Sequence, residues 1–321
     1  MLPDQRGRNR LDVARTETRL LPLITLVHVT KVELSEADVS AFRRDGYLLI
    51  ESVFTDDELA GYRDAADRIL ELSINSTVAL GRRHPRLDAK LHDDGTVTVR
   101  KIQPINDLDP RLAAIADDER LLGPLRQLMG DEPVLMEEKL NPKQLLDTRH
   151  VDVSVLASSS FNHEVGLEGF HLHHDWGYYR QQGYPEDTLS SAVAIDGCAG
   201  RGPLRVIPGS HLIDAPMADH DPASDSGVVV DGFFSPDDLV PLDVPAGSVM
   251  LFHAKLVHDS EPNRSGQPRR VMIYSHYPRS HDPDGNPDRR NGPVRNVSRE
   301  FEQRYLDLVD ANNIASQFSL R

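Results

Sequence analysis

The sequence predicts an all-β core with flanking helices, of the sandwich, jelly-roll or barrel type. Two observations predict this fold class. Helical periodicity stops near Gly130, and turn signals such as Pro208-Gly209 and Pro245-Ala246-Gly247 then separate one short apolar run from the next. Runs at this spacing are typical of antiparallel strands. The predicted strands are Val134–Leu140, Gly169–His174, Thr188–Ile195, Leu204–Ile207, Ser248–Phe252 and Val271–Tyr277.

Capped helices precede this core. Capping boxes mark two helix starts: Ser35 with Asp38, and Thr55 with Glu58. The first helix is expected to end at Gly46, and Tyr47–Val53 then predicts a strand. The second helix gathers apolar residues on one face, which we expect to pack on a sheet. These residues are Leu59, Tyr62, Ala66, Ile69 and Leu70.

A hairpin and a further helix complete the predicted flank. The turn Asp93-Asp94-Gly95 predicts a hairpin that leads into the strand Thr96–Ile102. Asp109-Pro110 starts a helix that is expected to end near Gly130. Pro124 lies inside this helix, and proline removes a backbone donor, so we expect a break or kink there.

We expect an N-terminal extension over 1–31 and one domain over 32–321. Within that domain the helical flank covers about 34–130, the β core about 131–280, and a helical tail about 298–310. Two further stretches, 145–168 and 213–238, are predicted to be long loops. Long loops in compact domains often form lids or binding walls.

Composition limits the partners. The chain has 321 residues and a formal net charge of -15, which disfavours nucleic acid and anionic membranes. Cys198 is the only cysteine, so an internal disulfide and a thiolate cluster are excluded, which is typical of the cytoplasm. There is no apolar run long enough for a transmembrane helix. We expect a small-molecule substrate, and the sequence does not indicate the oligomeric state.

The stretch His173-His174-Asp175 predicts a metal site. Residues two apart on a strand share a face, so His173 and Asp175 are expected to point the same way. His258 is the natural third ligand. Two imidazoles and one carboxylate form the facial triad of non-haem iron(II) oxygenases, which leaves positions open for a 2-oxo acid and dioxygen.

A 2-oxo acid also needs a cation for its distal carboxylate. Arginine offers two parallel donors that match a carboxylate. Arg269 follows His258 after the turn Asn263–Pro268, so a hairpin returns it beside the metal. Arg270 is adjacent, and on a strand only one of the two side chains can face the site.

These residues lie in a chain that resembles the phytanoyl-CoA dioxygenase family over roughly 34–277. The resemblance is carried by blocks in the family's order: Asp45-Gly46-Tyr47, Lys139-Leu140-Asn141-Pro142-Lys143, His173-His174-Asp175, Gly202–His211, and Gly247-Ser248 through His258-Asp259-Ser260 to Arg269-Arg270. It implies a double-stranded β-helix (jelly roll, cupin-like). It also implies that Ser260 and Asn141 contact 2-oxoglutarate together with Arg269.

The resemblance implies a dioxygenase that uses Fe(II), 2-oxoglutarate and O2, and releases succinate and CO2. Related halogenases have Ala or Gly where this chain has Asp175, so hydroxylation is expected. Desaturation and cyclisation stay open. The substrate is expected to be a small metabolite or natural-product intermediate, with Trp176, Tyr178, Tyr179 and His171 as candidate contacts. The loops 145–168 and 213–238 are the candidate lid and pocket wall.

Three alternatives stay open from the residues alone. A cupin-like metalloenzyme that does not use 2-oxoglutarate would bind its metal through His171, His173 and His258 and would not need Arg269. A non-catalytic protein would bind 2-oxoglutarate without turnover. A structural β-sandwich would carry these histidines without binding any metal.

Overall fold

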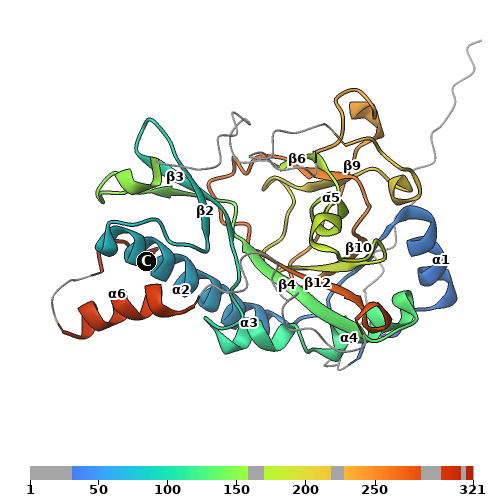
Figure 1. The fold of residues 1–321 in the computed structure, drawn as a ribbon, viewed down its shortest axis with the longest axis horizontal. Helices are drawn as coiled ribbons and strands as arrows, with labels where there is room; N and C mark the ends of the chain where they lie inside the picture. The colour runs from blue at the N-terminus through green and yellow to red at the C-terminus, as the bar shows by residue number, and fades with distance from the viewer. Residues whose placement is uncertain (1–30, 158–169, 218–227, 283–297, 312–315, 321) are drawn as a thin grey trace, which may run out of the picture.

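The computed structural model describes residues 31–157, 170–217, 228–282, 298–311 and 316–320. Its helices, shown in Figure 1, are α1 (Glu36–Asp45), α2 (Asp56–Leu80), α3 (Pro110–Ile115), α4 (Glu119–Met129), α5 (Trp176–Tyr179) and α6 (Glu300–Asp310). The predicted N-terminal extension lies, except for Lys31, outside the described residues. No helix in these ranges is both long and apolar enough to cross a membrane.

The strands form two antiparallel sheets. The larger has the order β1-β10-β7-β12-β4-β3-β2, with β5 paired to β3, and the smaller has the order β6-β11-β8-β9. The strands of the larger sheet are β1 (Tyr47–Ile50), β2 (Leu87–Leu91), β3 (Thr96–Ile102), β4 (Pro133–Asn141), β5 (Gln144–Asp147), β7 (Leu189–Ala194), β10 (Val249–His253) and β12 (Val271–Pro278). The strands of the smaller sheet are β6 (Phe170–His173), β8 (Leu204–Val206), β9 (Val240–Pro241) and β11 (His258–Ser260). The predicted jelly-roll core with flanking helices is confirmed.

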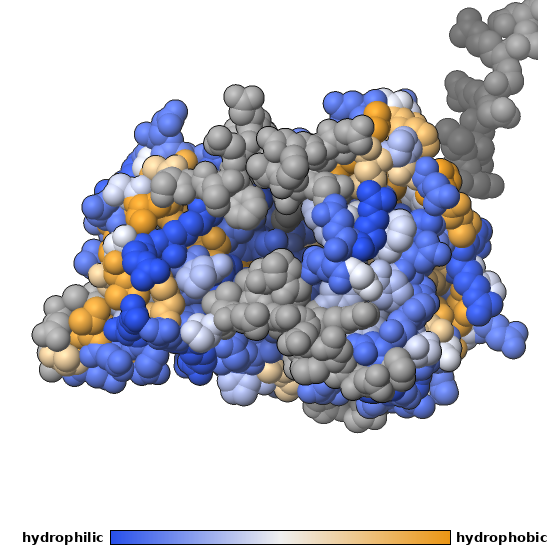
Figure 2. All heavy atoms as spheres, viewed as in Figure 1, coloured by the Kyte–Doolittle hydropathy of each residue, from blue (hydrophilic) through white to orange (hydrophobic). Residues whose placement is uncertain are grey.

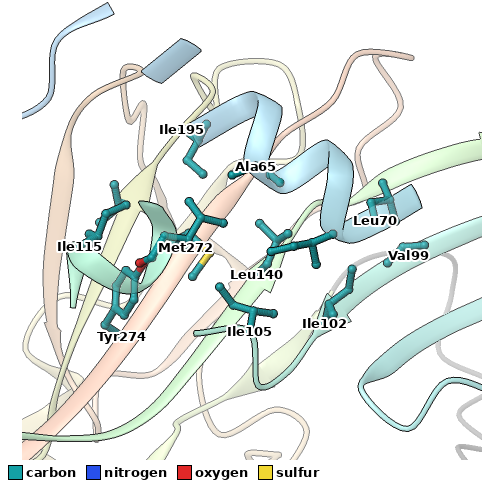
Figure 3. Packing of buried hydrophobic residues seen from close by; sticks show 14 of the residues in the cluster. Ala65, Leu70, Val99, Ile102, Ile105, Ile115, Leu140, Ile195, Met272 and Tyr274 are labelled. Atoms are coloured by element: carbon teal, nitrogen blue, oxygen red, sulfur yellow. The ribbon is translucent and has the colours of Figure 1, made fainter. Parts of the chain in front are cut away.

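Helix α2 covers one face of the larger sheet (Figure 1). Both predicted capping boxes are present, at Ser35 and Thr55. Ala65 and Leu70 of α2 are buried in one cluster with Leu140 and Met272 of the central strands β4 and β12 (Figure 3). The predicted apolar face of the helix therefore anchors the sheet that carries much of the site.

The predicted helix from Asp109 to Gly130 is two helices, and its break lies away from Pro124. Helix α3 ends at Ile115, and α4 restarts at Asp118, whose side chain accepts from the backbone N–H of Arg120. Pro124 lies inside α4, which continues through it with Leu121 and Leu125 fully buried. The new N-cap at Asp118, rather than the proline, sets the break.

The two predicted long loops are partly outside the described ranges. The first begins with strand β5, which pairs with β3, so this part of the prediction was wrong. The pairing was missed because a four-residue edge strand carries little periodicity. In the second stretch, an isolated bridge joins Val228 to His173 at the end of β6. The second stretch therefore touches the region of the predicted metal site.

Candidate active site

A cavity of about 330 Å³ lies between the two sheets. The large sheet lines it with side chains of β4, β10 and β12, and the small sheet lines it with His173 of β6 and with His258 and Ser260 of β11. Arg100 and Lys101 of β3 extend the lining. The face shown in Figure 2 is largely hydrophilic and is hollowed near its centre. The cavity has the size of a pocket for a small ligand.

His173, Asp175 and His258 converge in this cavity. Strands β6 and β11 pair antiparallel, with His173 directly opposite His258. The potential ligand atoms of the three side chains all lie within 4.8 Å of one another. His173 Nε2 is 3.7 Å from Asp175 Oδ1, and the two imidazole centroids are 4.2 Å apart. All three side chains are buried, so one metal ion could be held by them away from bulk water.

The convergence has a different local cause from the one that the sequence suggested. Strand β6 ends at His173, and Asp175 has helical backbone angles (φ -63°, ψ -31°) at the start of α5. Strand alternation therefore does not bring the two side chains together. The turn from strand into helix folds Asp175 back toward His173.

Hydrogen bonds to the backbone fix the histidine tautomers. His173 Nδ1 lies 2.6 Å from the carbonyl oxygen of His171, and His258 Nδ1 lies 2.9 Å from that of Leu256. A carbonyl only accepts, so each Nδ1 carries the proton and each Nε2 keeps its lone pair. Such second hydrogen bonds are usual for histidines that bind metals.

Electrostatics favour the ligand forms of the side chains. Burial, with the neighbouring His258, lowers the pKa of His173 to about 3, so its imidazole is neutral near pH 7. Burial opposes the ionisation of Asp175, but Lys139, with smaller contributions from the histidines, keeps the pKa of Asp175 below its ordinary value. The site thus offers two imidazoles and one carboxylate, a donor set that suits non-haem iron(II).

The predicted 2-oxoglutarate contacts line the same cavity. Asn141 lies at the end of β4, Ser260 at the end of β11, and Arg269 just before β12. Arg269 is 5% exposed, and its Nε has no hydrogen-bond partner in the part of the chain that the structure describes. The Oδ1 of Asn141 is likewise buried without a described partner. Buried polar groups are normally satisfied, so these two atoms indicate a place where a polar ligand belongs.

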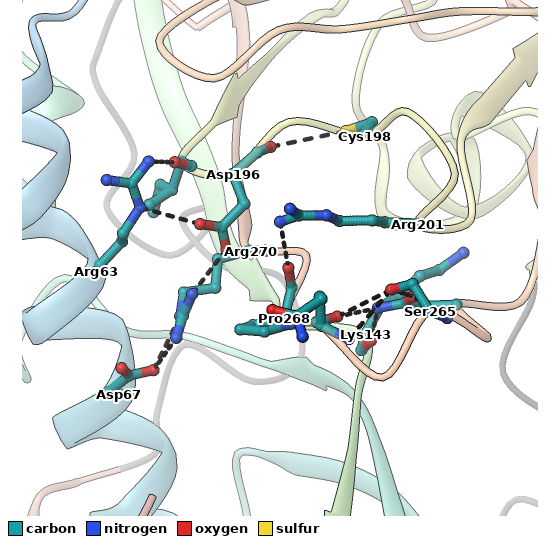
Figure 4. Close-up of polar contacts among 12 residues, drawn as sticks. Arg63, Asp67, Lys143, Asp196, Cys198, Arg201, Ser265, Pro268 and Arg270 are labelled. Carbon is teal, nitrogen blue, oxygen red and sulfur yellow. Dashed lines mark hydrogen bonds and ion pairs between the residues drawn. The ribbon is translucent and has the colours of Figure 1, made fainter. Parts of the chain in front are cut away.

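Arg270 points away from this cavity, as the strand argument predicted. Its guanidinium lies 2.6 Å from Asp67 of α2 and 2.7 Å from Asp196, which also binds Arg63 at 3.0 Å (Figure 4). This network ties the start of β12 to helix α2. Two adjacent arginines therefore have separate environments, one paired within the protein and one in the cavity.

A charged network beside Asp175 was missed by the sequence analysis. Glu137 accepts from Lys139 Nζ at 2.8 Å, from the Tyr179 hydroxyl at 2.7 Å and from Gln103 Nε2 at 2.9 Å. Burial opposes the charge on Lys139, yet Glu137 and Asp175 raise the pKa of Lys139 above its ordinary value. Residues two apart on a strand point to the same face, and this relation holds for Glu137, Lys139 and Asn141 on β4. Counting backward from Asn141 in steps of two would therefore have identified Lys139 and Glu137.

Two of the four candidate substrate contacts line the cavity, namely Tyr178 and Tyr179. Trp176 is not in the cavity wall and packs in a separate cluster with Tyr179 and Tyr184.

His171, the fourth candidate substrate contact, is exposed and is not among the residues that line the cavity. Ser260 pairs with Phe170 instead of residue 171, which adds one residue to β6 and breaks its alternation. The ligand set of the cupin-like alternative is therefore not assembled.

Known proteins match this chain over most of its length. The family described as Phytanoyl-CoA dioxygenase (PhyH) matches residues 42–271. The ectoine dioxygenase of Sphingopyxis alaskensis is 27% identical over 282 residues, with 82% of each chain covered. That of Bordetella parapertussis is 27% identical over 267 residues, with 75% of each chain covered.

Solved structures share the fold. EctD from S. alaskensis, solved with 2-oxoglutarate and 5-hydroxyectoine, superposes with a TM-score of 0.56 at 24% identity and covers 80% of this chain and 82% of its own. The epimerase SnoN, in complex with Fe3+, alpha ketoglutarate and nogalamycin RO, gives a TM-score of 0.53 at 20% identity, with 76% and 83% covered. The chain therefore belongs to the phytanoyl-CoA dioxygenase (PhyH) family, and the predicted enzyme class, a non-haem iron dioxygenase that uses 2-oxoglutarate, is confirmed.

Proposed function

We propose that this enzyme hydroxylates an unactivated C–H bond of a small molecule, with iron(II) held by His173, Asp175 and His258. Succinate and CO2 are the co-products. One observation carries the proposal: a buried set of two imidazoles and one carboxylate shares a cavity with a buried arginine whose Nε has no described hydrogen-bond partner. The first group suits iron(II), and the second suits the distal carboxylate of a 2-oxo acid.

The 2-oxoglutarate contacts are assigned to three residues. Arg269 presents parallel N–H donors to the distal carboxylate, and Ser260 adds a hydroxyl from the neighbouring strand end. Asn141 offers its side-chain amide from β4. All three line the cavity with the triad, which supports this assignment.

Iron, when bound, supplies the activation of dioxygen and the oxidising power for C–H cleavage. The chain supplies position and water exclusion. Asp175 supplies a carboxylate where halogenases of this family have Ala or Gly, which supports hydroxylation over halogenation.

The cavity wall offers a small substrate both charged and aromatic contacts. Lys139 and Glu137 place a charge pair beside Asp175, and Tyr178 and Tyr179 add aromatic surface with hydroxyls. Relatives named ectoine dioxygenase make ectoine the first compound to test. Intermediates of natural-product biosynthesis form the second class, since the structural neighbour SnoN is named an epimerase in complex with nogalamycin RO. We place this activity in the cytoplasm and in a single catalytic domain over 32–321.

The test is turnover with isotopically labelled dioxygen. The iron-loaded enzyme is incubated with 2-oxoglutarate and one candidate at a time, and succinate and substrate mass are measured. We expect one labelled oxygen atom in the product and one in succinate, and both signals should vanish in His258→Ala. Succinate formation that persists in His258→Ala would contradict the assignment of the triad.

A further inference from the structure

Lys143 is a buried lysine in an unusual backbone conformation between β4 and β5. It is 1% exposed and has a φ of 37°, a left-handed value that residues other than glycine seldom adopt. Asn263 Nδ2 donates to the Lys143 carbonyl at 2.9 Å, and Arg269 N donates to Pro142 O at 3.3 Å. Figure 4 shows Lys143 beside the turn that contains Ser265 and Pro268. This backbone conformation costs free energy, and the surrounding fold holds Lys143 in it. Such strained positions are concentrated at functional sites.

The side chain of Lys143 reaches Ser260. Its Nζ donates to Ser260 Oγ at 2.6 Å and to the carbonyl oxygen of Glu261 at 2.8 Å. In its ammonium form Lys143 has donors and no acceptor, so Ser260 Oγ is then the acceptor in this pair. The proton of Ser260 must then point elsewhere. Ser260 lines the cavity together with Arg269, so the cavity is the direction that offers an anionic acceptor.

The charges around Lys143 agree with an anion nearby in the working enzyme. Burial, followed by the positive charge of Arg269, lowers the pKa of Lys143 to about 6; Arg100 acts in the same direction, and Cys198 and Asp259 act in the opposite one. A carboxylate beside Arg269 offsets the positive charge of Arg269, which is the second of these causes, and attracts the ammonium group. It therefore favours the ammonium form, in which the Ser260 hydroxyl is free to donate to that carboxylate.

We propose that Lys143 is a positioning residue for the co-substrate: it holds Ser260 Oγ as an acceptor and so directs the Ser260 proton to the distal carboxylate of 2-oxoglutarate beside Arg269. The inference rests on the proposed function of this cavity. It assigns Lys143 a role through Ser260 and no direct contact with the reacting atoms.

The test is an anaerobic double-mutant cycle on Lys143→Met and Ser260→Ala. Affinity is read from the visible charge-transfer band that appears when a 2-oxo acid binds the iron(II) enzyme. Two probes are used, 2-oxoglutarate and 2-oxovalerate; the second has a methyl group in place of the distal carboxylate. Each single change should weaken 2-oxoglutarate binding by about tenfold, the effect of one charge-assisted hydrogen bond.

The double variant should be no weaker than the weaker single variant, because Lys143 acts through Ser260. Neither change should alter the affinity for 2-oxovalerate. If Lys143→Met does not fold, Lys143→Gln, which keeps a shorter donor, takes its place in the cycle and should lose less affinity than Ser260→Ala.

Three results would overturn the inference: multiplicative losses in the double variant, equal losses for both probes, or unchanged 2-oxoglutarate affinity in Lys143→Met. Absence of the band in the unaltered enzyme would instead reject the proposed function itself. The two failures are therefore distinguishable.

Discussion

Replacing Arg269 or its neighbour Arg270 by methionine should have opposite consequences. Arg269 is buried in the cavity, where its Nε lacks a described partner, whereas Arg270 is paired with Asp67 at 2.6 Å and with Asp196 at 2.7 Å. Methionine keeps most of the apolar stem and removes the charge. The two variants lie at adjacent positions just before β12, so comparing them separates an effect on ligand binding from an effect on folding.

The magnitudes follow from these environments. Removing one partner of a buried ion pair costs about 2–5 kcal/mol of binding free energy. Arg269→Met should therefore weaken the binding of 2-oxoglutarate by roughly 30-fold to a few thousand-fold. The apo protein should not lose stability, because a buried charge whose Nε is unsatisfied is removed. Arg270→Met leaves Asp67 and Asp196 without their cation and should destabilise the fold by about 3 kcal/mol or more.

The assays are urea unfolding of the apo proteins and anaerobic 2-oxoglutarate titration of the iron-loaded ones. Arg270→Met should keep the dissociation constant of the unaltered enzyme while its unfolding midpoint falls. The reasoning is refuted if Arg269→Met binds 2-oxoglutarate normally, or if Arg270→Met loses binding while it remains folded.

Three further changes have defined outcomes. Asp175→Ala removes a metal ligand, so it should weaken iron(II) binding by more than the roughly 10–100-fold that is typical of changes to outer-sphere residues. Unchanged iron content after dialysis would argue against ligation by Asp175. Leu140→Ala should lower the unfolding free energy by about 2–5 kcal/mol, measured by urea unfolding, since Leu140 of β4 is fully buried in one cluster with the apolar face of α2; a loss below about 1 kcal/mol would disagree. Burial alone would raise the pKa of Glu58, but its bonds with Arg120 and Thr55 lower it to about 2. Because this pKa is lower than the value of about 4.3 in the unfolded chain, Glu58 contributes to the free energy of unfolding at pH values above 4.3. That contribution is lost as the pH falls toward 2. Glu58→Gln should therefore be less stable than the parent at pH 7, and the difference should shrink below pH 4.3; a pH-independent difference would contradict the sign.

Local signals in the sequence predicted much of the fold. The capping boxes at Ser35 and Thr55 satisfy helix N–H groups within four residues, so they are visible without tertiary knowledge. The strands of the large sheet are apolar runs bounded by turns, and β4, β7, β10 and β12 lie where those runs predicted them. Strand β11 was not predicted, because its residues His258–Ser260 are all polar and no apolar run marks them.

The site was predicted in its residues and less well in its geometry. The spacing of His173, Asp175 and His258 indicated a metal site, although Asp175 reaches it through a helical turn. The extra residue in β6 that exposes His171 depends on pairing with β11, which strand parity within one segment cannot reveal. The link between Lys143 and Ser260 joins residues far apart in the chain and appears only in the folded protein.

The proposed function requires that one cavity binds iron(II) and 2-oxoglutarate together. The most direct measurement is an anaerobic titration of the apo protein with iron(II) and then with 2-oxoglutarate, followed by visible absorption. We expect a charge-transfer band that saturates at one 2-oxoglutarate per iron. Iron binding should require His173, Asp175 and His258, and 2-oxoglutarate affinity should require Arg269. Iron binding without the band would show that 2-oxoglutarate does not bind the iron of this cavity.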